Sequence, residues 1–277
     1  MFRTVPPRFS VAALLFVVAL APLDEGVDFS RPPDQGMRIK VTEQIKGRLT
    51  GTLEIGGNEV AIGSPLDATE IYVHTVLEVK ERKVLKIQRE YEESGGEDDA
   101  TPLAWKTLRA TWEEDGDGEG SITVKEDEEW KPAGELLTRF VTLRSLRQPI
   151  LLLPPRKMEA GQSWEFGAKE IRRYFPAVKL GNAAAKLGGE GKITFREVAR
   201  IKDEKCAVLD VEIQIDSSIE GTEVSTTRLA GVVHYSLEHR VIVGLKGKGT
   251  MKRYGPAAMS GSLQLEYKVK VLEKEDG

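Results

Sequence analysis

The sequence predicts a mainly β protein, with curved antiparallel sheets built from long hairpins and one helix packed on a sheet. Two observations carry this prediction. Apolar and polar residues alternate along most of the chain after Met37, and short charged or glycine-containing turns separate the alternating segments. Alternation is typical of strands that bury one face, and short turns join antiparallel neighbours.

The N-terminus has the layout of a secretory signal peptide. Arg3 and Arg8 precede an apolar run from Val11 that ends in Ala19-Leu20-Ala21. We therefore expect residues 1–21 to direct export to the periplasm or the exterior. The run is about half the roughly 20 residues of a membrane-spanning helix, so we expect no transmembrane span. Pro22 fits poorly after a cleavage site, which leaves an uncleaved N-terminal anchor as the alternative.

Composition narrows the class of protein further. The chain has 40 basic and 44 acidic residues, a balance that argues against nucleic-acid binding, because such binding depends on neutralising phosphates. Its single cysteine, Cys206, excludes an intrachain disulfide. Stability must therefore come from burial of a core, for which the 277 residues suffice.

The predicted elements follow in chain order. Residues 22–36 contain three prolines and little apolar periodicity, which predicts a linker. An N-terminal β-rich half over 37–150 and a C-terminal antiparallel half over 151–277 come next. The alternating segments that we expect to form strands are 39–45, 49–55, 71–79, 85–91, 108–112, 193–201, 209–215, 233–237, 241–251 and 263–271.

One segment has helical spacing. Leu136, Phe140 and Leu143 recur with that period between Pro132 and Pro149, which predicts a helix over about 132–147 that covers a sheet. The stretch 168–185 is open between a short helix and a loop.

The two halves show a trace of internal duplication. A shift of 122 positions superposes Ile71 and Val76 on Ile193 and Val198, within strand-turn-strand segments. Any two hairpins share such a pattern, so chance similarity is the alternative.

The passage LPPRKMEAGQSWEF at 153–166, followed by long hairpins and the GVVHYSL segment at 231–237, resembles a family of secreted bacterial β-rich proteins of unknown function. In that family a proline-containing entry, a glycine and a tryptophan introduce each large sheet module. The resemblance covers mainly the C-terminal half. It implies an envelope location and a curved antiparallel sheet, and it transfers no catalytic residue. Gly161 and Trp164 are expected to be a turn glycine and a core aromatic.

The sharpest local motif lies at 115–126, DGDGEGSITVKE, which matches the spacing of an EF-hand calcium loop. The predicted metal ligands are Asp115, Asp117, Glu119, Ser121, Thr123 and Glu126. The flanking residues alternate like strands instead of forming helices. An acidic hairpin tip that binds no metal is therefore the alternative.

No enzyme motif occurs in the sequence, and the three histidines are expected to lie on solvated faces. Lys246, Lys248 and Lys252 share one predicted strand face, which could meet an anionic glycan or another envelope component. The sequence thus favours an exported, non-enzymatic envelope protein that acts as a scaffold or a ligand-binding sheet surface. A calcium-stabilised interaction module and a carrier of a hydrophobic ligand are the alternatives. A cavity beside the sheet would favour the carrier.

Overall fold

The computed structural model describes residues 26–56, 58–81, 83–96, 109–114, 120–126, 129–132, 153–174, 178–180, 183–255 and 257–272. These residues form one 13-stranded antiparallel sheet, a two-stranded sheet and one short helix, which confirms the predicted fold class. The sheet is not closed: its path runs from β10 through β11–β15 to β2 and on to β7, with β9 beside β11.

The N-terminal elements are β1 (Val27–Asp28), β2 (Arg38–Ile55), β3 (Asn58–Lys80), β4 (Lys83–Gly96), β5 (Arg109–Glu114), β6 (Gly120–Glu126) and β7 (Glu129–Pro132). The C-terminal elements are β8 (Lys157–Met158), β9 (Ser163–Phe166), α2 (Ala168–Tyr174), β10 (Val178–Leu180), β11 (Ala183–Ile201), β12 (Glu204–Ile219), β13 (Thr222–Ser236), β14 (Ile242–Arg253) and β15 (Met259–Leu272).

Strands of both predicted halves belong to the same sheet. The last strand, β15, pairs with the first long strand, β2, over its whole length, from Met259 opposite Gly51 to Leu272 opposite Arg38. The hydrogen-bonded ladder therefore continues from one half into the other.

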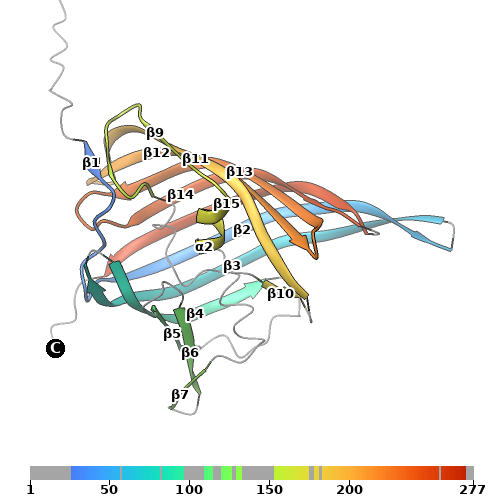
Figure 1. Cartoon of the computed structure of the whole chain (residues 1–277), viewed down its shortest axis with the longest axis horizontal. Coiled ribbons are helices and arrows are strands. Elements are labelled where there is room, and N and C mark those ends of the chain that lie inside the picture. The colour runs from blue at the N-terminus through green and yellow to red at the C-terminus, as the bar shows by residue number, and fades with distance from the viewer. Residues whose placement is uncertain are drawn as a thin grey trace, which may run out of the picture.

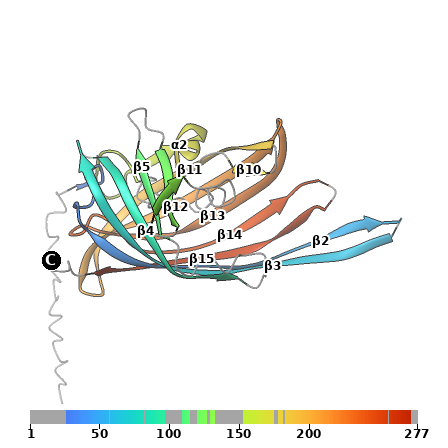
Figure 2. The same cartoon turned by 90° about the horizontal axis from the view of Figure 1, so that it is seen from below.

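The sheet is strongly curved, and α2 lies on its concave side (Figures 1 and 2). The concave face carries the core. Along β15, the alternating residues Leu263, Leu265, Tyr267, Val269 and Val271 lie on this face as predicted, with Tyr267 buried and the others half-buried. The opposite face is charged, and Glu266 forms ion pairs there with Lys246 at 3.3 Å and Lys268 at 3.1 Å.

Glycines on the concave face make this curvature sterically possible. A Cβ atom built on Gly261 would lie 1.8 Å from the carbonyl oxygen of Arg48, and one on Gly249 would lie 2.0 Å from that of Arg228. Both distances are far below van der Waals contact. The neighbouring backbone can approach this closely only because these positions lack a side chain.

The linker prediction for 22–36 is wrong for the part that the structure describes. Val27 of β1 pairs with Met158 of β8, and Phe29 is buried. The Phe29 ring lies 5.7 Å from the ring of Phe195 and 5.2 Å from that of Tyr235, centroid to centroid. This segment therefore belongs to the core, because two apolar side chains outweigh the local loop composition.

Other predictions fall partly outside the described residues. The signal segment 1–21 lies outside them, as does the helix over 132–147 except for Pro132, the last residue of β7. The open stretch 168–185 contains α2 and then β10. The shift proposed for the duplication places the β3–β4 and β11–β12 turns one residue out of step, because the turns begin at Glu81 and Lys202.

Within the described part of the chain, no helix is both long enough and apolar enough to span a membrane.

Replacing Gly261 with alanine tests the role of the concave-face glycines. We expect Gly261→Ala to lower the free energy of unfolding by about 1–3 kcal/mol, because the added methyl group must push β15 away from β2. Urea unfolding followed by circular dichroism measures the change. Ser262→Ala, at the exposed neighbouring position, is the matched control and should change little. Equal losses would show that the close approach is not a constraint.

Candidate functional site

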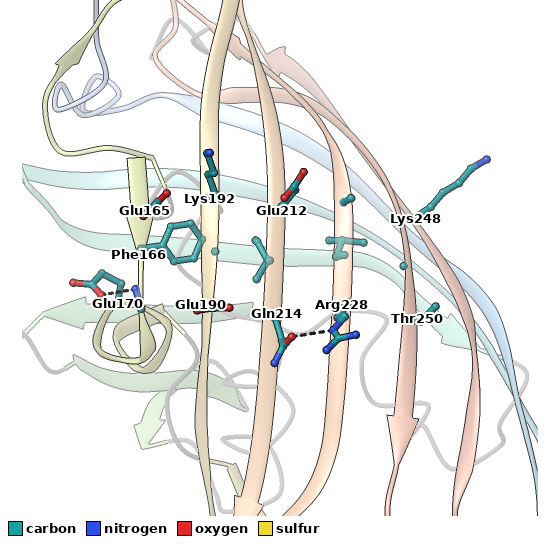
Figure 3. Close-up of a pocket in the computed structure, with 16 residues that line it drawn as sticks. Glu165, Phe166, Glu170, Glu190, Lys192, Glu212, Gln214, Arg228, Lys248 and Thr250 are labelled. Carbon is teal, nitrogen blue, oxygen red and sulfur yellow. Dashed lines mark hydrogen bonds between the residues drawn. The ribbon is translucent and has the colours of Figure 1, made fainter. Parts of the chain in front are cut away.

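An open hollow of about 900 Å³ lies on four adjacent strands, β11 to β14, next to β9 and the start of α2 (Figure 3). The strands supply residues 190–192, 212–214, 228–230 and 248–250 to its lining. Hollows of about 300–1,000 Å³ are typical of small-molecule sites in proteins. The region is therefore the candidate binding site.

The floor of the hollow is a single row of paired residues on the concave face. Gly191 of β11 lies opposite Ile213 of β12, which lies opposite Leu229 of β13, which in turn lies opposite Gly249 of β14. Ile213 and Leu229 are both half-buried. Ile213 and Leu229 therefore supply the side chains of the floor. At the two glycines the position of a Cβ atom is already occupied, by the Phe166 ring at Gly191 and by the Arg228 carbonyl oxygen at Gly249.

Phe166 at the end of β9 closes one side of the row. A Cβ atom on Gly191 would lie 2.2 Å from the Phe166 ring, so the ring occupies the space above that glycine. Trp164 packs against Phe166 with ring centroids 5.0 Å apart. Gly161 precedes these residues with φ +87°, so the expected turn glycine is confirmed. Trp164 packs against the core as expected.

A second, smaller cavity of about 30 Å³ adjoins the hollow. Ile213 and Leu229 line both spaces, and the other residues around the small cavity are apolar or glycine: Leu153, Ile193, Val211, Gly231, Val233, Ile242, Leu245 and Gly247. The space is just large enough for one water molecule but offers no polar side chain to hold it. The small cavity is therefore suited to the end of an apolar group.

Charged residues of both signs are next to the floor residues in sequence. The lining includes Glu165, Glu170, Glu190, Lys192, Glu212, Arg228 and Lys248. Two of these groups are already engaged: Arg228 Nε donates to Gln214 Oε1 at 2.9 Å, and the Gly167 amide donates to Glu170 Oε2 at 3.0 Å (Figure 3). Glu190, Lys192, Glu212, Arg228 and Lys248 alternate with the floor residues along their strands, so their side chains project to the opposite, charged face of the sheet.

The concave face continues as apolar rows beyond the hollow. On the far side of Gly249 the row proceeds through Leu263 and Gly47 to Leu66 of β3. The next row outward contains Leu49, which is buried, and Gly261. An apolar surface therefore connects the hollow with the outer parts of β2 and β3.

A buried polar cluster lies on the same face, closer to the core end of β2, β3, β4 and β15. The Arg89 guanidinium lies 4.0 Å from the centroid of the Tyr72 ring, and its Nη1 donates to Tyr91 Oη at 3.2 Å. Tyr267 joins through a hydrogen bond with Tyr72, and Glu43 interacts electrostatically with Arg89. Charged and aromatic groups thus satisfy one another inside the sheet.

Burial disfavours the charged form of Arg89, but its contacts with Tyr72, Tyr91 and Glu43 outweigh this effect and raise its pKa. The guanidinium therefore stays charged. Burial also raises the pKa values of Tyr72 and Tyr267, so both phenols are neutral at physiological pH.

His74 is buried beside Arg89, which lies opposite it on β4. The expectation of a solvated histidine is wrong here, because a β-bulge between Val76 and Glu78 changes the phase of β3, so His74 does not share the face of Glu78. Among the described residues, neither ring nitrogen of His74 has a hydrogen-bond partner. Burial, and then the positive charge of Arg89, hold the pKa of His74 well below its usual value, so the imidazole is neutral at pH 7.

The predicted calcium loop divides between described and undescribed residues. Asp115, Asp117 and Glu119 lie outside the described residues, whereas Ser121, Thr123 and Glu126 belong to β6. Six strand residues rise about 20 Å, so Glu126 is far along the strand from Gly120. Over the described ranges, no group of three or more His, Cys, Asp or Glu residues is placed to hold a metal ion. Calcium binding stays a prediction.

Two further sequence features have clear positions. Cys206 is buried, and burial followed by the charge of Glu204 raises the pKa of its thiol to about 11, so the thiolate is scarce at neutral pH. Lys246, Lys248 and Lys252 face the same side of β14, where Glu266 already pairs with Lys246. An anionic partner for this face stays a prediction.

Comparison with protein-family models and with curated proteins gave no match. Among solved structures, the chain is similar to an outer membrane channel from Pseudomonas putida F1, with 9% identity over 88% of this chain and 98% of that chain. The TM-score is 0.23, so this likeness carries no argument. The functional case rests on the geometry of the hollow.

The buried histidine predicts a loss of stability in acid. Because the folded-state pKa of His74 is lowered, the unfolded chain binds more protons below about pH 6.5, so stability should fall there by up to about 1.4 kcal/mol per pH unit. The contribution is fully present above that pH. Urea unfolding between pH 7.5 and 5 should show a shallower acid loss in His74→Leu than in the wild type. Parallel pH profiles would contradict a buried neutral imidazole.

The calcium hypothesis predicts stabilisation by the metal. If the 115–126 loop binds calcium in the folded state, about 1 mM calcium should raise the melting temperature relative to chelator. Asp115→Asn should abolish the shift, because it removes a charged ligand. Asp203→Asn, in the exposed β11–β12 turn, is the control. If several millimolar calcium leaves the melting curve of the wild type unchanged, the calcium hypothesis is wrong and the 115–126 segment is an acidic turn that binds no metal.

Proposed function

We propose that the protein is an exported, non-enzymatic binding protein that holds an apolar or amphiphilic small molecule against the concave face of its sheet. The main support for this proposal is the hollow of about 900 Å³. Its floor is the paired row Gly191, Ile213, Leu229 and Gly249. Export is the prediction of the N-terminal segment 1–21.

The shape of the floor supports an apolar ligand. Ile213 and Leu229 are only half-buried, although they lie on the face that forms the core, so a ligand could cover the remaining apolar surface. Burial of apolar surface contributes about 25 cal/mol per Å². The adjoining apolar cavity adds room for the end of an apolar chain.

The rim supports a ligand with a polar part. Glu170 and the backbone of Gly167, at the start of α2, line the hollow on the concave side (Figure 2), so a headgroup beside α2 could find hydrogen-bond partners while the apolar part lies on the floor. A site of this kind combines an apolar surface with a few polar groups that fix orientation. An amphiphile satisfies both requirements.

The scaffold alternative rests on the solid part of the molecule. The core cluster around Phe29, Phe195 and Tyr235 is well packed. That region supplies stability at one end of the strands, whereas the hollow lies beside it. The packed core and the hollow can occur in the same protein. The hollow, unlike the core, indicates which kind of ligand the protein binds.

A fluorescent long-chain fatty acid is the probe for this proposal. The exported protein, whose mass should lack residues 1–21, is expected to bind the probe with saturation. Leu229→Gln should weaken binding by about tenfold or more, because it places an amide on the apolar floor. Fluorescence titration measures the dissociation constant.

Lys270→Gln, on the exposed face of β15 and away from the hollow, is the control for loss of a long side chain and should bind like the wild type. Circular dichroism checks that each variant is folded. No saturable binding by the wild type, or equal binding by Leu229→Gln, would refute a fatty-acid-like ligand on this floor.

A further inference from the structure

The hairpin of β2 and β3 extends beyond the rest of the sheet as a two-stranded arm (Figures 1 and 2). β15 pairs with β2 only as far as Gly51, and β4 pairs with β3 only from Ala68 onward. Residues 52–55 and 58–67 therefore have one paired neighbour each among the described strands. Isolated two-stranded hairpins are only marginally stable in water, so a surface that covers this arm would stabilise it.

The arm has one apolar and one polar face. Leu53 pairs with Val60, and Ile55 and Ile62 lie on the same face because they are two residues away along their strands. The other face carries Thr52, Glu54, Glu59 and Ala61. The apolar face continues the apolar rows of the concave surface through Gly51 and Leu49.

Exposed large apolar side chains gather at this end of the molecule. Among the described residues, those clearly exposed are Ile55 at 56%, Val60 at 43% and Tyr254 at 44%. Tyr254 lies in the turn between β14 and β15, and Met259, which begins β15, pairs with Gly51 at the base of the arm. Tyr254 is turned away from the arm, because its Oη donates to Thr226 Oγ1 at 3.4 Å and Thr226 faces the charged side of β13. Ile55 and Val60 are therefore the exposed members of this set that lie on the apolar face of the arm.

A second copy of the chain fits this surface poorly. The free edge of β3 carries Glu59, Pro65 and Asp67, and a proline together with charges opposes pairing with another strand. A stable protein interface also needs about 800 Å² from each partner. Four apolar side chains on a thin arm, two of them already half-buried, fall short of that area.

A lipid bilayer fits better. Apolar side chains at a narrow tip can enter the boundary between headgroups and acyl chains without a complementary partner surface. The charged residues of the described arm beyond Gly51 are Glu54 and Glu59, on its polar face, so no basic patch accompanies the apolar face. The attraction would therefore be apolar rather than electrostatic, and only weakly dependent on salt.

We propose that the tip of the β2–β3 hairpin inserts into the interfacial region of a lipid bilayer, with Ile55 and Val60 as the inserted side chains. The apolar rows of the concave face then lead from the bilayer surface toward the hollow. Insertion does not require a ligand in the hollow, so the two proposals can fail separately.

Sedimentation with phosphatidylcholine vesicles tests the proposal. The exported protein should bind these neutral vesicles with similar affinity at low and high salt. The double variant Ile55→Ser/Val60→Ser should bind about tenfold or more weakly, because two inserted side chains lose their apolar character. Thr52→Ser/Ala61→Ser makes the same number of changes on the polar face and should bind like the wild type.

A label on the arm locates the contact and excludes binding through the N-terminal segment. Cys206 is buried, so Val60→Cys offers the accessible thiol for an environment-sensitive fluorophore, with Thr52→Cys as its control. On vesicles, the label at position 60 should shift to shorter wavelength more than the label at position 52. Equal shifts, or no binding by the wild type, would overturn the proposal.

Two more measurements separate the alternatives. The double serine variant should keep its affinity for the fluorescent fatty acid in the absence of vesicles, because the arm does not line the hollow. Analytical ultracentrifugation should show the wild type as a monomer. A dimer that dissociates in the double serine variant would instead make the arm a self-association surface and would overturn membrane insertion.

Discussion

Close approach of backbones on the concave face is the constraint on which the rest of the structure depends. In a strongly curved sheet, the inner side chains of neighbouring strands converge. At Gly249 and Gly261 even a single methyl group would collide with a carbonyl oxygen of the adjacent strand. The bend therefore requires glycine at these points, and the bend in turn brings β11 to β14 around the hollow.

Glycine has no side chain to pack, so the glycines that permit the curvature reduce apolar contacts in the core. These glycines occur in one region of the sheet. Toward the core end, Phe195, Leu209 and Tyr235 fill the concave face, and Phe29, which follows β1, packs on two of them. Toward the hairpin tips, glycines alternate with half-buried leucines. One sheet thus combines a packed end, which supplies stability, with an end that leaves apolar surface available for a ligand or a bilayer.

Local patterning was sufficient to predict the class of fold and most strand faces. Alternation along β15 identified its inward residues correctly, because both of its neighbours are regular antiparallel strands. Alternation failed for His74, since bulges in the pairing of β3 with β4 change the phase and apolar residues occur on both faces. It also failed for Phe29, whose burial depends on Phe195 and Tyr235, both far away in the sequence.

The hollow left only a partial signal in the sequence. Glycines two residues apart, as at 189 and 191 or 247 and 249, mark one face of a strand as open. Which leucine or isoleucine lies opposite each glycine depends on register, and register is set by pairing between strands. For the same reason, alternation could not show that Phe166 would occupy the space above Gly191.

In strands this long, apolar alternation alone does not fix the register between neighbouring strands. A slip of two residues would keep every apolar side chain on the inner face. The buried polar cluster opposes such a slip. Arg89 lies over Tyr72 and donates to Tyr91, and Tyr72 bonds Tyr267 of β15, so three strands must align for these groups to meet. A slip would leave a buried guanidinium away from its aromatic and acidic neighbours, which is strongly unfavourable. The cluster thereby fixes the pairing from which the glycine and leucine rows of the hollow follow.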